Sequence, residues 1–320
     1  MNQANNITRK HVGVDVSKAK LDCWKATKAN KGGSFKSFAN SGKGVKALLK
    51  WIPAGGHVVV EATGGYEELA VVTCHNLGVP VSVVNPKSVR DMANAQGRRA
   101  KTDRLDAELI ARFADIVEPA PAPKPTKAQT ALAAHVDLRE NLVADRTRQL
   151  NRLEKETNPS LRSLLKSMIA RFEKAISKID KQIEAIIASC PKMTLMCKEL
   201  RSIPGIGQVI SSTLVALLPQ LGTLSRRQVS ALCGLAPYAR DSGTKKGKRF
   251  ISGGRGKLRR RLYMGALSLA KHQSPMAAQY RAMVARGKLK MVALVALARK
   301  LAILANTTCK PLSSLPYATH

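Results

Sequence analysis

Apolar and polar positions alternate in two different ways along the chain. In residues 11–117, short β-branched runs such as HVGVDVS (11–17) and HVVVE (57–61) are separated by stretches with helical periodicity. This pattern predicts strands at 11–17, 21–27, 57–61 and 79–86, and helices at 44–52 and 66–77. Strands that alternate with helices are typical of a layered α/β fold with a parallel or mixed sheet.

A longer helical period begins after a proline-rich segment. Residues 118–127, EPAPAPKPTK, predict an extended linker because proline removes amide donors and stiffens the backbone. Beyond Asn158–Pro159, apolar residues recur in steps of three and four, close to a heptad repeat. They are Leu161, Leu165, Met168, Phe172, Ile176, Ile179, Ile183 and Ile186.

A weaker repeat precedes the Asn158–Pro159 break, and Arg139 and Arg146 stand at two of its core-like positions. We therefore predict a coiled-coil helical arm over residues 128–200, which is either a hairpin within one chain or an arm that pairs two chains. Residues 201–320 predict a second, helical domain, with an apolar core helix near 290–305. The predicted division is thus 1–117, 118–127, 128–200 and 201–320.

The charge of the chain indicates what kind of partner it binds. With 54 basic and 21 acidic side chains the net charge is +33, so a large anionic partner is expected. Nucleic acid is favoured over an anionic membrane, since no run of apolar residues is long enough to span one and residues 1–10 lack the apolar segment of a signal peptide. The expected location is the cytoplasm of a prokaryote, at the nucleoid. The six cysteines form no CxxC pair, which predicts free thiols and no zinc site.

Four acidic residues are candidates for metal binding. Asp15 and Glu61 belong to predicted strands, and Asp103 and Asp106 share one face of a predicted helix. Carboxylates from these elements can converge on a pair of Mg²⁺ ions, which could clamp the two oxygens exchanged in phosphoryl transfer. The order strand Asp, strand Glu, helix DxxD resembles that of a ribonuclease-H-like fold of the Holliday-junction resolvase type. Each acid taken alone is more typical of a turn or a solvated helix face.

The second half of the chain offers phosphate-binding candidates. The IPGIG turn resembles a helix-hairpin-helix element, in which Gly205 and Gly207 would let backbone amides approach a phosphate; a plain tight turn is the alternative. A glycine-rich basic segment follows. Its candidate nucleic-acid-binding residues are Lys245, Lys246, Lys248, Arg249, Arg255, Lys257, Arg259 and Arg260.

Ser252 lies inside this basic segment. A serine hydroxyl needs a base or a metal to become a good nucleophile, and no histidine is placed convincingly as its base. Nearby cations could stabilise charge on a phosphate. Ser242 has the same local environment in the sequence.

Together these motifs resemble the DEDD-type insertion-sequence transposases, which include pilin-gene invertases and bridge-RNA-guided recombinases. The matching segments are VGVDVSKAKLD, EATGGYEELA, VNPKSVRDMANAQGRRAKTDRLDAELIARF, SIPGIG and CGLAPYARDSGTKKGKRFISGGRGKLRRRLYMGAL. They occur in family order over nearly the whole chain.

The resemblance implies more than the residues do alone. It implies a Mg²⁺-binding DEDD set of Asp15, Glu61, Asp103 and Asp106, and a nucleophilic Ser252 that forms a phosphoserine link to DNA. It also implies a non-coding bridge RNA, donor and target DNA, and dimers or tetramers of the chain. Two other functions stay open: a metal-dependent, structure-specific nuclease that uses water, and a non-catalytic nucleic-acid chaperone.

Overall fold

The computed structural model describes residues 10–27, 33–97, 102–239, 241–244 and 247–317. The chain packs as two compact units, Met1–Lys124 and Pro125–His320. The first unit has an α/β fold and the second, apart from a small two-stranded ribbon, is helical. Lys245 and Lys246 lie outside the described residues.

A mixed five-stranded sheet forms the centre of the first unit. Its strands are β1 (His11–Val16), β2 (Lys20–Lys25), β3 (Ser34–Ala39), β4 (His57–Glu61) and β5 (Val81–Val84). They lie in the order β3-β2-β1-β4-β5. Strand β2 is antiparallel to both β1 and β3, whereas β4 is parallel to both β1 and β5. This is the ribonuclease-H-like order that the sequence predicted.

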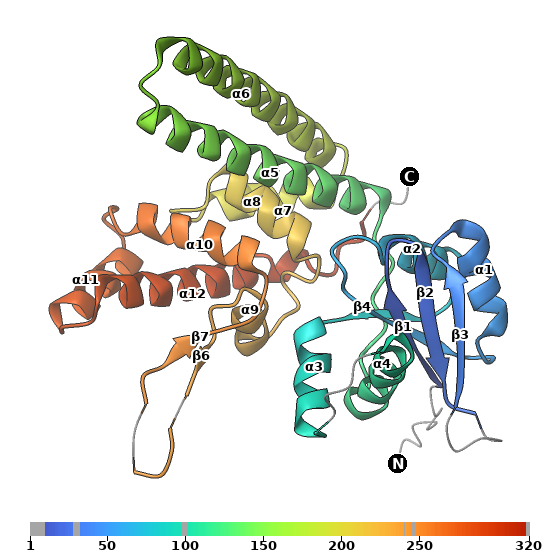
Figure 1. The fold of residues 1–320 in the computed structure, drawn as a ribbon. Helices are drawn as coiled ribbons and strands as arrows, with labels where there is room; N and C mark the ends of the chain where they lie inside the picture. The colour runs from blue at the N-terminus through green and yellow to red at the C-terminus, as the bar shows by residue number, and fades with distance from the viewer. Residues whose placement is uncertain (1–9, 28–32, 98–101, 240, 245–246, 318–320) are drawn as a thin grey trace. The chain divides into compact units, whose positions relative to one another are not determined.

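Helices cover both faces of this sheet (Figure 1). On one face, α1 (Gly42–Trp51) and α2 (Glu68–Asn76) bury Leu48 and Cys74 against Val12, Val14 and Val60. The other face carries α3 (Pro86–Ala95) and α4 (Asp103–Val117), whose Val89, Ile110 and Phe113 pack against Val59.

Two elements of this unit were not predicted. Strand β3, SFKSFA, has polar residues at half of its positions and buries only Phe38 fully. Helix α3 begins at the proline that was expected only to end a strand: Pro86 is its first residue, and the Asn85 side chain caps it by accepting a hydrogen bond from the Lys87 amide.

Gly13 sets the distance between β1 and α4. A Cβ atom at this position would collide with the backbone of Ala107 and Ala111. These two alanines are one helical turn apart, so they lie on the same face of α4. Their small side chains let that face pack directly on the glycine. The close packing fixes the start of α4 over the end of β1.

Two long helices open the second unit. Helices α5 (Lys127–Lys155) and α6 (Pro159–Ala188) pack against each other as a hairpin within the chain. Both arginines at core-like positions of α5 pair with acids of α6: Arg139 Nε lies 2.5 Å from Asp180 Oδ1, and Arg146 Nη1 lies 3.9 Å from Glu173 Oε1.

The buried stripe of α6 differs slightly from the predicted heptad repeat. Ile176, Ile179 and Ile183 are buried as expected, but Ile169 and Ile187 are buried in place of Met168 and Ile186. A straight helix has 3.6 residues per turn, so a strict heptad stripe drifts around it and neighbouring residues take over at each end.

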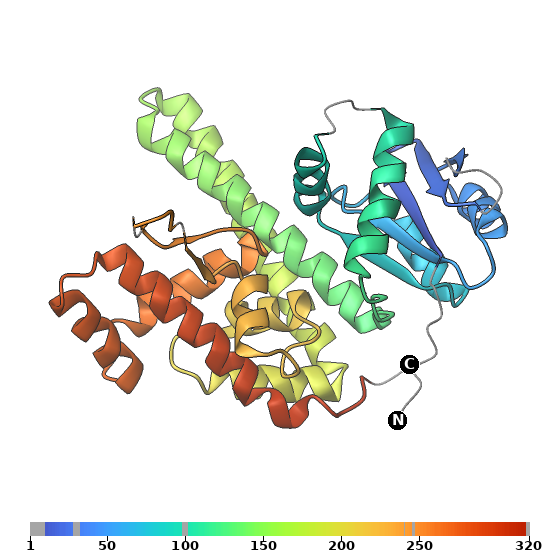
Figure 2. The same ribbon diagram turned by 90° about the horizontal axis from the view of Figure 1, so that it is seen from below.

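The rest of the second unit packs around one large core. Its helices are α7 (Pro191–Arg201), α8 (Gln208–Leu217), α9 (Arg226–Leu232), α10 (Gly256–Leu269), α11 (Pro275–Ala285), α12 (Lys290–Thr308) and the 3₁₀ turn Lys310–Leu312. Strands β6 (Pro237–Tyr238) and β7 (Phe250–Ile251) pair as a short antiparallel ribbon. Helix α12, red in Figure 2, packs against α10 and α11.

Among the described helices, α12 alone is long and apolar enough to cross a membrane, and 44% of its apolar window is buried inside the protein. Its Leu297, Leu301 and Ala305 belong to the large core of the second unit. The predicted core helix near 290–305 is therefore present, and its composition follows from that burial.

Candidate active site

Three carboxylates form a row across the first sheet. Asp15 on β1 is directly opposite Asp22 on β2. On the other side, β1 and β4 run in parallel with Val14 beside Val60, so the next residues along the two strands are Asp15 and Glu61. All three side chains project to the face that Gly13 presents to α4, because they share its alternation and register.

The start of α4 brings two further acids to this face. Asp103 is one turn before Ala107 on the stripe that packs on Gly13, and the Thr102 side chain caps the helix by accepting from the Leu105 amide. The Asp106 side chain is 15% exposed, whereas that of Asp103 is 58% exposed. The four acids singled out from the sequence thus lie at one end of one face of the sheet.

The surroundings of Asp15 raise the pKa of its carboxyl group. Burial raises the pKa of its carboxyl above the ordinary value, and the charges of Asp106, Asp22 and Asp103 raise it further. Such a shift means that the ionised form of Asp15 is disfavoured until a cation joins the group.

Two basic side chains supply positive charge to the cluster. Lys20 Nζ lies 3.1 Å from Asp22 Oδ2 and 2.5 Å from Asp103 Oδ2, and the hydrogen bond to Asp103 is the main cause of a raised pKa for Lys20. Arg90 on α3 lies 3.7 Å from Asp106 Oδ1. Glu61, Arg90 and Asp106 also line a small cavity of about 20 Å³ between β4, α3 and α4.

The cluster as it stands is not a finished metal site. Within the described part of the chain, no three His, Cys, Asp or Glu side chains converge closely enough to hold a metal ion. The acids share a face, but Lys20 contacts Asp22 and Asp103, and Arg90 lies beside Asp106.

Ser252 is held between two fixed elements of the second unit. It directly follows β7 and precedes α10, and it is half-buried. Gly254 packs against the backbone of Ala231 and Gly234 at the end of α9, and the Arg255 amide donates to the Leu232 carbonyl over 2.7 Å. In the described residues no acid or histidine hydrogen-bonds the Ser252 hydroxyl. Ser242 is exposed, in the segment that connects β6 to β7.

Several of the predicted phosphate-binding cations are used within the fold. Arg255 donates to the Leu217 carbonyl, and Lys257 pairs with Asp137 of α5. Arg259 donates to the Gly253 carbonyl over 2.9 Å, which braces the Ser252 segment. Arg249 lies 2.7 Å from Asp241 Oδ1.

Lys248 and Arg260 differ from these residues. Within the described parts of the chain, neither makes an ion pair with an acid or a hydrogen bond to a carbonyl. Among the members of the predicted set that the structure describes, they are the ones whose charge is most available to a phosphate.

The IPGIG turn joins α7 to α8 in a tight helical pair. Gly205 has φ +89°, and a Cβ there would meet the Gly265 carbonyl and the Leu269 side chain, so close packing on α10 explains this glycine. Gly207 caps α8 without a side-chain hydrogen bond and faces open space, so its role at a phosphate stays a prediction.

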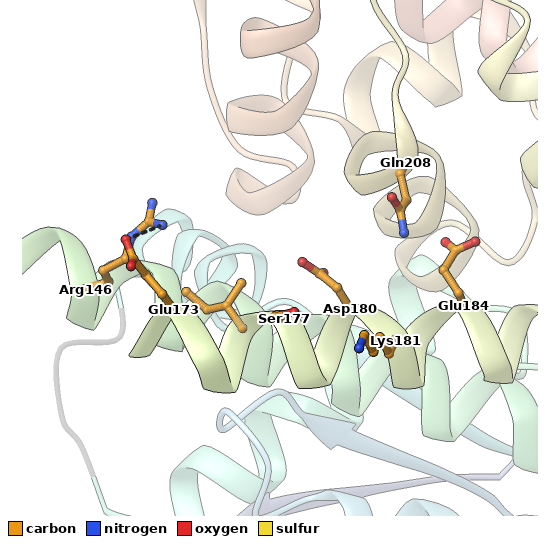
Figure 3. Close-up of a pocket in the computed structure, with 8 residues that line it drawn as sticks. Arg146, Glu173, Ser177, Asp180, Lys181, Glu184 and Gln208 are labelled. Atoms are coloured by element: carbon orange, nitrogen blue, oxygen red, sulfur yellow. Dashed lines mark ion pairs between the residues drawn. The ribbon is translucent and has the colours of Figure 1, made fainter. Parts of the chain in front are cut away.

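A groove of about 520 Å³ lies between α6 and the start of α8. Figure 3 shows Glu173, Asp180 and Glu184 along its α6 side and Gln208 opposite. Asp180 and Glu184 are paired with Arg139 and Arg201 respectively. Arg146 and Lys181 line the same groove, so acids and bases are mixed there. Because its basic side chains have acids beside them, this face of the hairpin is a weaker candidate for a nucleic-acid surface than an unpaired basic segment.

Sequence reasoning missed three residues of the acidic site. Asp22 and Lys20 belong to the quoted segment VGVDVSKAKLD, but only the β1–β2 register places Asp22 opposite Asp15. Arg90 was missed because helix α3 was not predicted. The alternation of buried Leu21 and Cys23 around Asp22 is the signal that could have put this acid on the α4 face.

Comparisons with known proteins identify the family of the chain. Residues 12–158 match the model of a DEDD transposase family of IS110 type, and residues 197–281 match that of the transposase IS116/IS110/IS902 family. The chain is 29% identical to the pilin gene-inverting protein of Moraxella bovis over 92% of this chain and 94% of that protein. It is 26% identical to the transposase for insertion sequence element IS1111A of Coxiella burnetii, over 68% and 66%. The chain belongs to the IS110-type DEDD transposases, a family of enzymes that transfer phosphoryl groups on DNA.

Proposed function

We propose that this chain is a site-specific DNA recombinase of an insertion sequence, in which a Mg²⁺-dependent acid site and the Ser252 hydroxyl act on the same phosphodiester. The observation that carries the proposal is the row Asp22, Asp15 and Glu61 under the start of α4, where Asp103 and Asp106 complete the acids of the family.

The donor set suits a divalent metal, as the family implies. Carboxylate oxygens are the ligands that Mg²⁺ prefers. Burial raises the pKa of the Asp15 carboxyl, and the negative charges of the neighbouring aspartates raise it further. Asp15, Glu61, Asp103 and Asp106 would hold the metal, which we expect to be two ions. When bound, the metal would supply Lewis-acid stabilisation of the charge that develops on the phosphate oxygens.

The step assigned to Ser252 keeps the energy of the broken DNA bond. Its Oγ attacks the phosphorus, the Oγ–P bond forms, and the P–O bond to the leaving deoxyribose oxygen breaks, with the serine proton leaving to solvent. A hydroxyl of another DNA end then reverses the step, so strands exchange without hydrolysis. The rigid support of the segment by Gly254, Arg255 and Arg259 favours a fixed nucleophile.

The proposed partners follow from the charge and from the family resemblance. A net charge of +33 with only 4% aromatic residues suits the holding of nucleic-acid backbones more than the stacking of bases. We propose donor and target DNA and a non-coding bridge RNA as the ligands, and a dimer or tetramer of the chain as the active assembly. A cytoplasmic location at the nucleoid belongs to the same proposal.

The test is to trap the covalent intermediate. Purified full-length protein is mixed with Mg²⁺, the RNA transcribed from the flanking element and labelled DNA that carries the element's ends. We expect a labelled protein–DNA species on a denaturing gel, with the nucleotide mapped to Ser252 by mass spectrometry. The species should be absent for Ser252→Ala and for Asp15→Asn, and present for Ser242→Ala.

Other outcomes distinguish the competing functions. A covalent species that persists in Ser252→Ala and disappears in Ser242→Ala would move the nucleophile to Ser242. Cleaved DNA without attached protein, made equally by Ser252→Ala, would identify a metal-dependent nuclease. Nucleic-acid remodelling that is unchanged in Asp15→Asn and needs no metal would identify a chaperone.

A further inference from the structure

Lys20 occupies an unusual place for a lysine. Its ammonium lies between Asp22 of β2 and Asp103 of α4, 3.1 and 2.5 Å from their carboxylate oxygens. The Asp22 side chain is 3% exposed and also accepts a hydrogen bond from the Ser37 hydroxyl, so it is a fixed anchor. The lysine side chain itself is 47% exposed.

We infer that Lys20 is a built-in counter-cation of the acid site, which occupies it in the absence of metal and is displaced when a divalent ion binds. The inference rests on the proposed metal role of the acids. It makes Lys20 a positioning residue that sets metal affinity.

One of the two acids that Lys20 contacts, Asp103, belongs to the proposed metal-binding set. The oxygen of Asp103 that meets the ammonium accepts a charge-assisted hydrogen bond with an electron pair that would otherwise ligate the metal. A lysine charge within a few ångströms also repels an incoming divalent cation by Coulomb's law. Both effects lower the affinity of the site for metal as long as Lys20 stays in place.

The surroundings of Lys20 allow it to leave. Its four-carbon chain is flexible and half-exposed, so the ammonium can turn into water, where it is well solvated. Asp22 would keep the hydrogen bond from Ser37 after the lysine departs. Arg90, at 3.7 Å from Asp106, adds a weaker charge of the same sign on the other side of the cluster.

A calorimetric titration with Mn²⁺, on full-length protein without nucleic acid, tests this inference. We expect Lys20→Met to bind Mn²⁺ about tenfold more tightly than the wild type, because a competing charge has been removed. Lys20→Arg, which keeps the charge, should stay within about twofold of the wild type. The matched control is Lys18→Met, which removes an exposed lysine two residues away that makes no ion pair among the described residues.

A second measurement compares the melting temperatures of these variants. Without metal, Lys20→Met should melt at a lower temperature than Lys18→Met, and Mn²⁺ should raise its melting temperature by more than it raises that of the wild type. Lys20→Gln serves in the same comparison if the methionine variant does not fold.

The possible failures are separable. Equal or weaker Mn²⁺ binding by Lys20→Met, with the wild type binding measurably, would overturn the role of Lys20 alone and leave it a structural ion pair. If neither the wild type nor Lys20→Met binds Mn²⁺, or if Asp15→Asn binds it as well as the wild type, the metal role of the acids fails and this inference fails with it.

Discussion

Gly13 allows helix α4 to pack closely against strand β1 beside the acid site. It allows the Ala107–Ala111 stripe of α4 to lie on β1, and Asp103 continues that stripe one turn earlier. The distance between the strand acids and the helix acids therefore depends on a missing methyl group.

We expect Gly13→Ala to lower the free energy of unfolding by about 1–3 kcal/mol, because the added Cβ has to push α4 away from the sheet. Urea denaturation of the full-length protein measures the change. Gly42→Ala is the matched control: its Cβ would meet no atom within 4 Å, and its stability should stay within about 0.5 kcal/mol of the wild type. Equal effects of the two variants would contradict the close packing.

The raised pKa of Asp15 predicts an unusual pH dependence. Because the folded state holds this proton more tightly than the unfolded state does, the contribution of Asp15 to stability is fully present below its ordinary pKa of 3.8. It is lost as the pH rises through the higher pKa of the folded protein. Without metal, ionised Asp15 therefore opposes folding at neutral pH.

We expect Asp15→Asn to be more stable than the wild type near pH 7 in EDTA, and the difference to shrink toward about pH 4. Urea denaturation at the two pH values measures it. The same variant should be inactive in the covalent reaction, so stability and activity change in opposite directions. A variant that is less stable than the wild type at neutral pH would contradict the electrostatic account.

Residue types and order predicted that Asp15, Glu61, Asp103 and Asp106 act together, and the structure brings them to one face of the sheet, while their role at a metal stays a prediction. Residue types and order were not sufficient for Asp22 and Lys20, because a strand residue's face and neighbours depend on the register with the next strand. For Arg255, Lys257 and Arg259, the charge could be read from the residue type, but the carbonyl or acid that each one contacts could not.

At the scale of elements, the hairpin of α5 and α6 contains a buried ion pair that the hydrophobic pattern of the sequence does not predict. Arg139 stands at a core-like position, and its side chain is only 13% exposed. It is tolerated because Asp180 accepts from its Nε over 2.5 Å and from its Nη2 over 3.2 Å. Asp180 is on another helix, 41 residues away in the sequence. The repeat alone therefore showed only that arginines stand at two positions where apolar residues are expected.

We expect Asp180→Ala to cost about 2 kcal/mol of unfolding free energy, since it leaves a largely buried guanidinium without its carboxylate. The double variant Arg139→Met with Asp180→Ala should recover most of that stability, because it leaves no unpaired buried charge. Urea denaturation of the four proteins of this cycle provides the coupling energy.

The exposed pair Arg148–Asp145 is the control for this cycle, because the Arg148 side chain is 65% exposed. Asp145→Ala should cost less than about 0.5 kcal/mol. A double variant as unstable as Asp180→Ala would show that the ion pair is not what the hairpin requires at this position.

Element prediction succeeded where burial imposes a clear period on the sequence. Strands β1, β4 and β5 are short valine-rich runs, and α6 carries a long isoleucine stripe. Helix α3 buries only Val89 and Ala93, and β3 lies at the edge of the sheet with polar residues between its two phenylalanines. Neither leaves a strong pattern, although α3 brings Arg90 to the acid site.

At the scale of the whole molecule, the net charge of +33 was enough to predict nucleic acid as the partner, before the fold was known. The fold then restricts where that charge can act. The groove along α6 has acids beside its basic side chains Arg146 and Lys181, whereas Lys248 and Arg260 flank the Ser252 segment without an acidic partner among the described residues. Net charge alone could not separate these two surfaces.

The salt dependence of DNA binding measures how that charge is used. Each phosphate that a basic side chain neutralises releases condensed counterions, so the logarithm of the binding constant should fall steeply and linearly with the logarithm of the salt concentration. We expect the double variant Lys248→Gln with Arg260→Gln to bind more weakly, and its slope to be less steep by roughly 0.9 for each phosphate that is no longer neutralised. Lys181→Gln, which removes a charge from the groove along α6, should leave the slope unchanged. Fluorescence anisotropy with a labelled duplex, from about 50 to 200 mM salt, gives all three slopes. If Lys181→Gln flattened the slope as much as the double variant, the nucleic acid would follow the hairpin groove, and the surface around Ser252 would not be where the backbone is held.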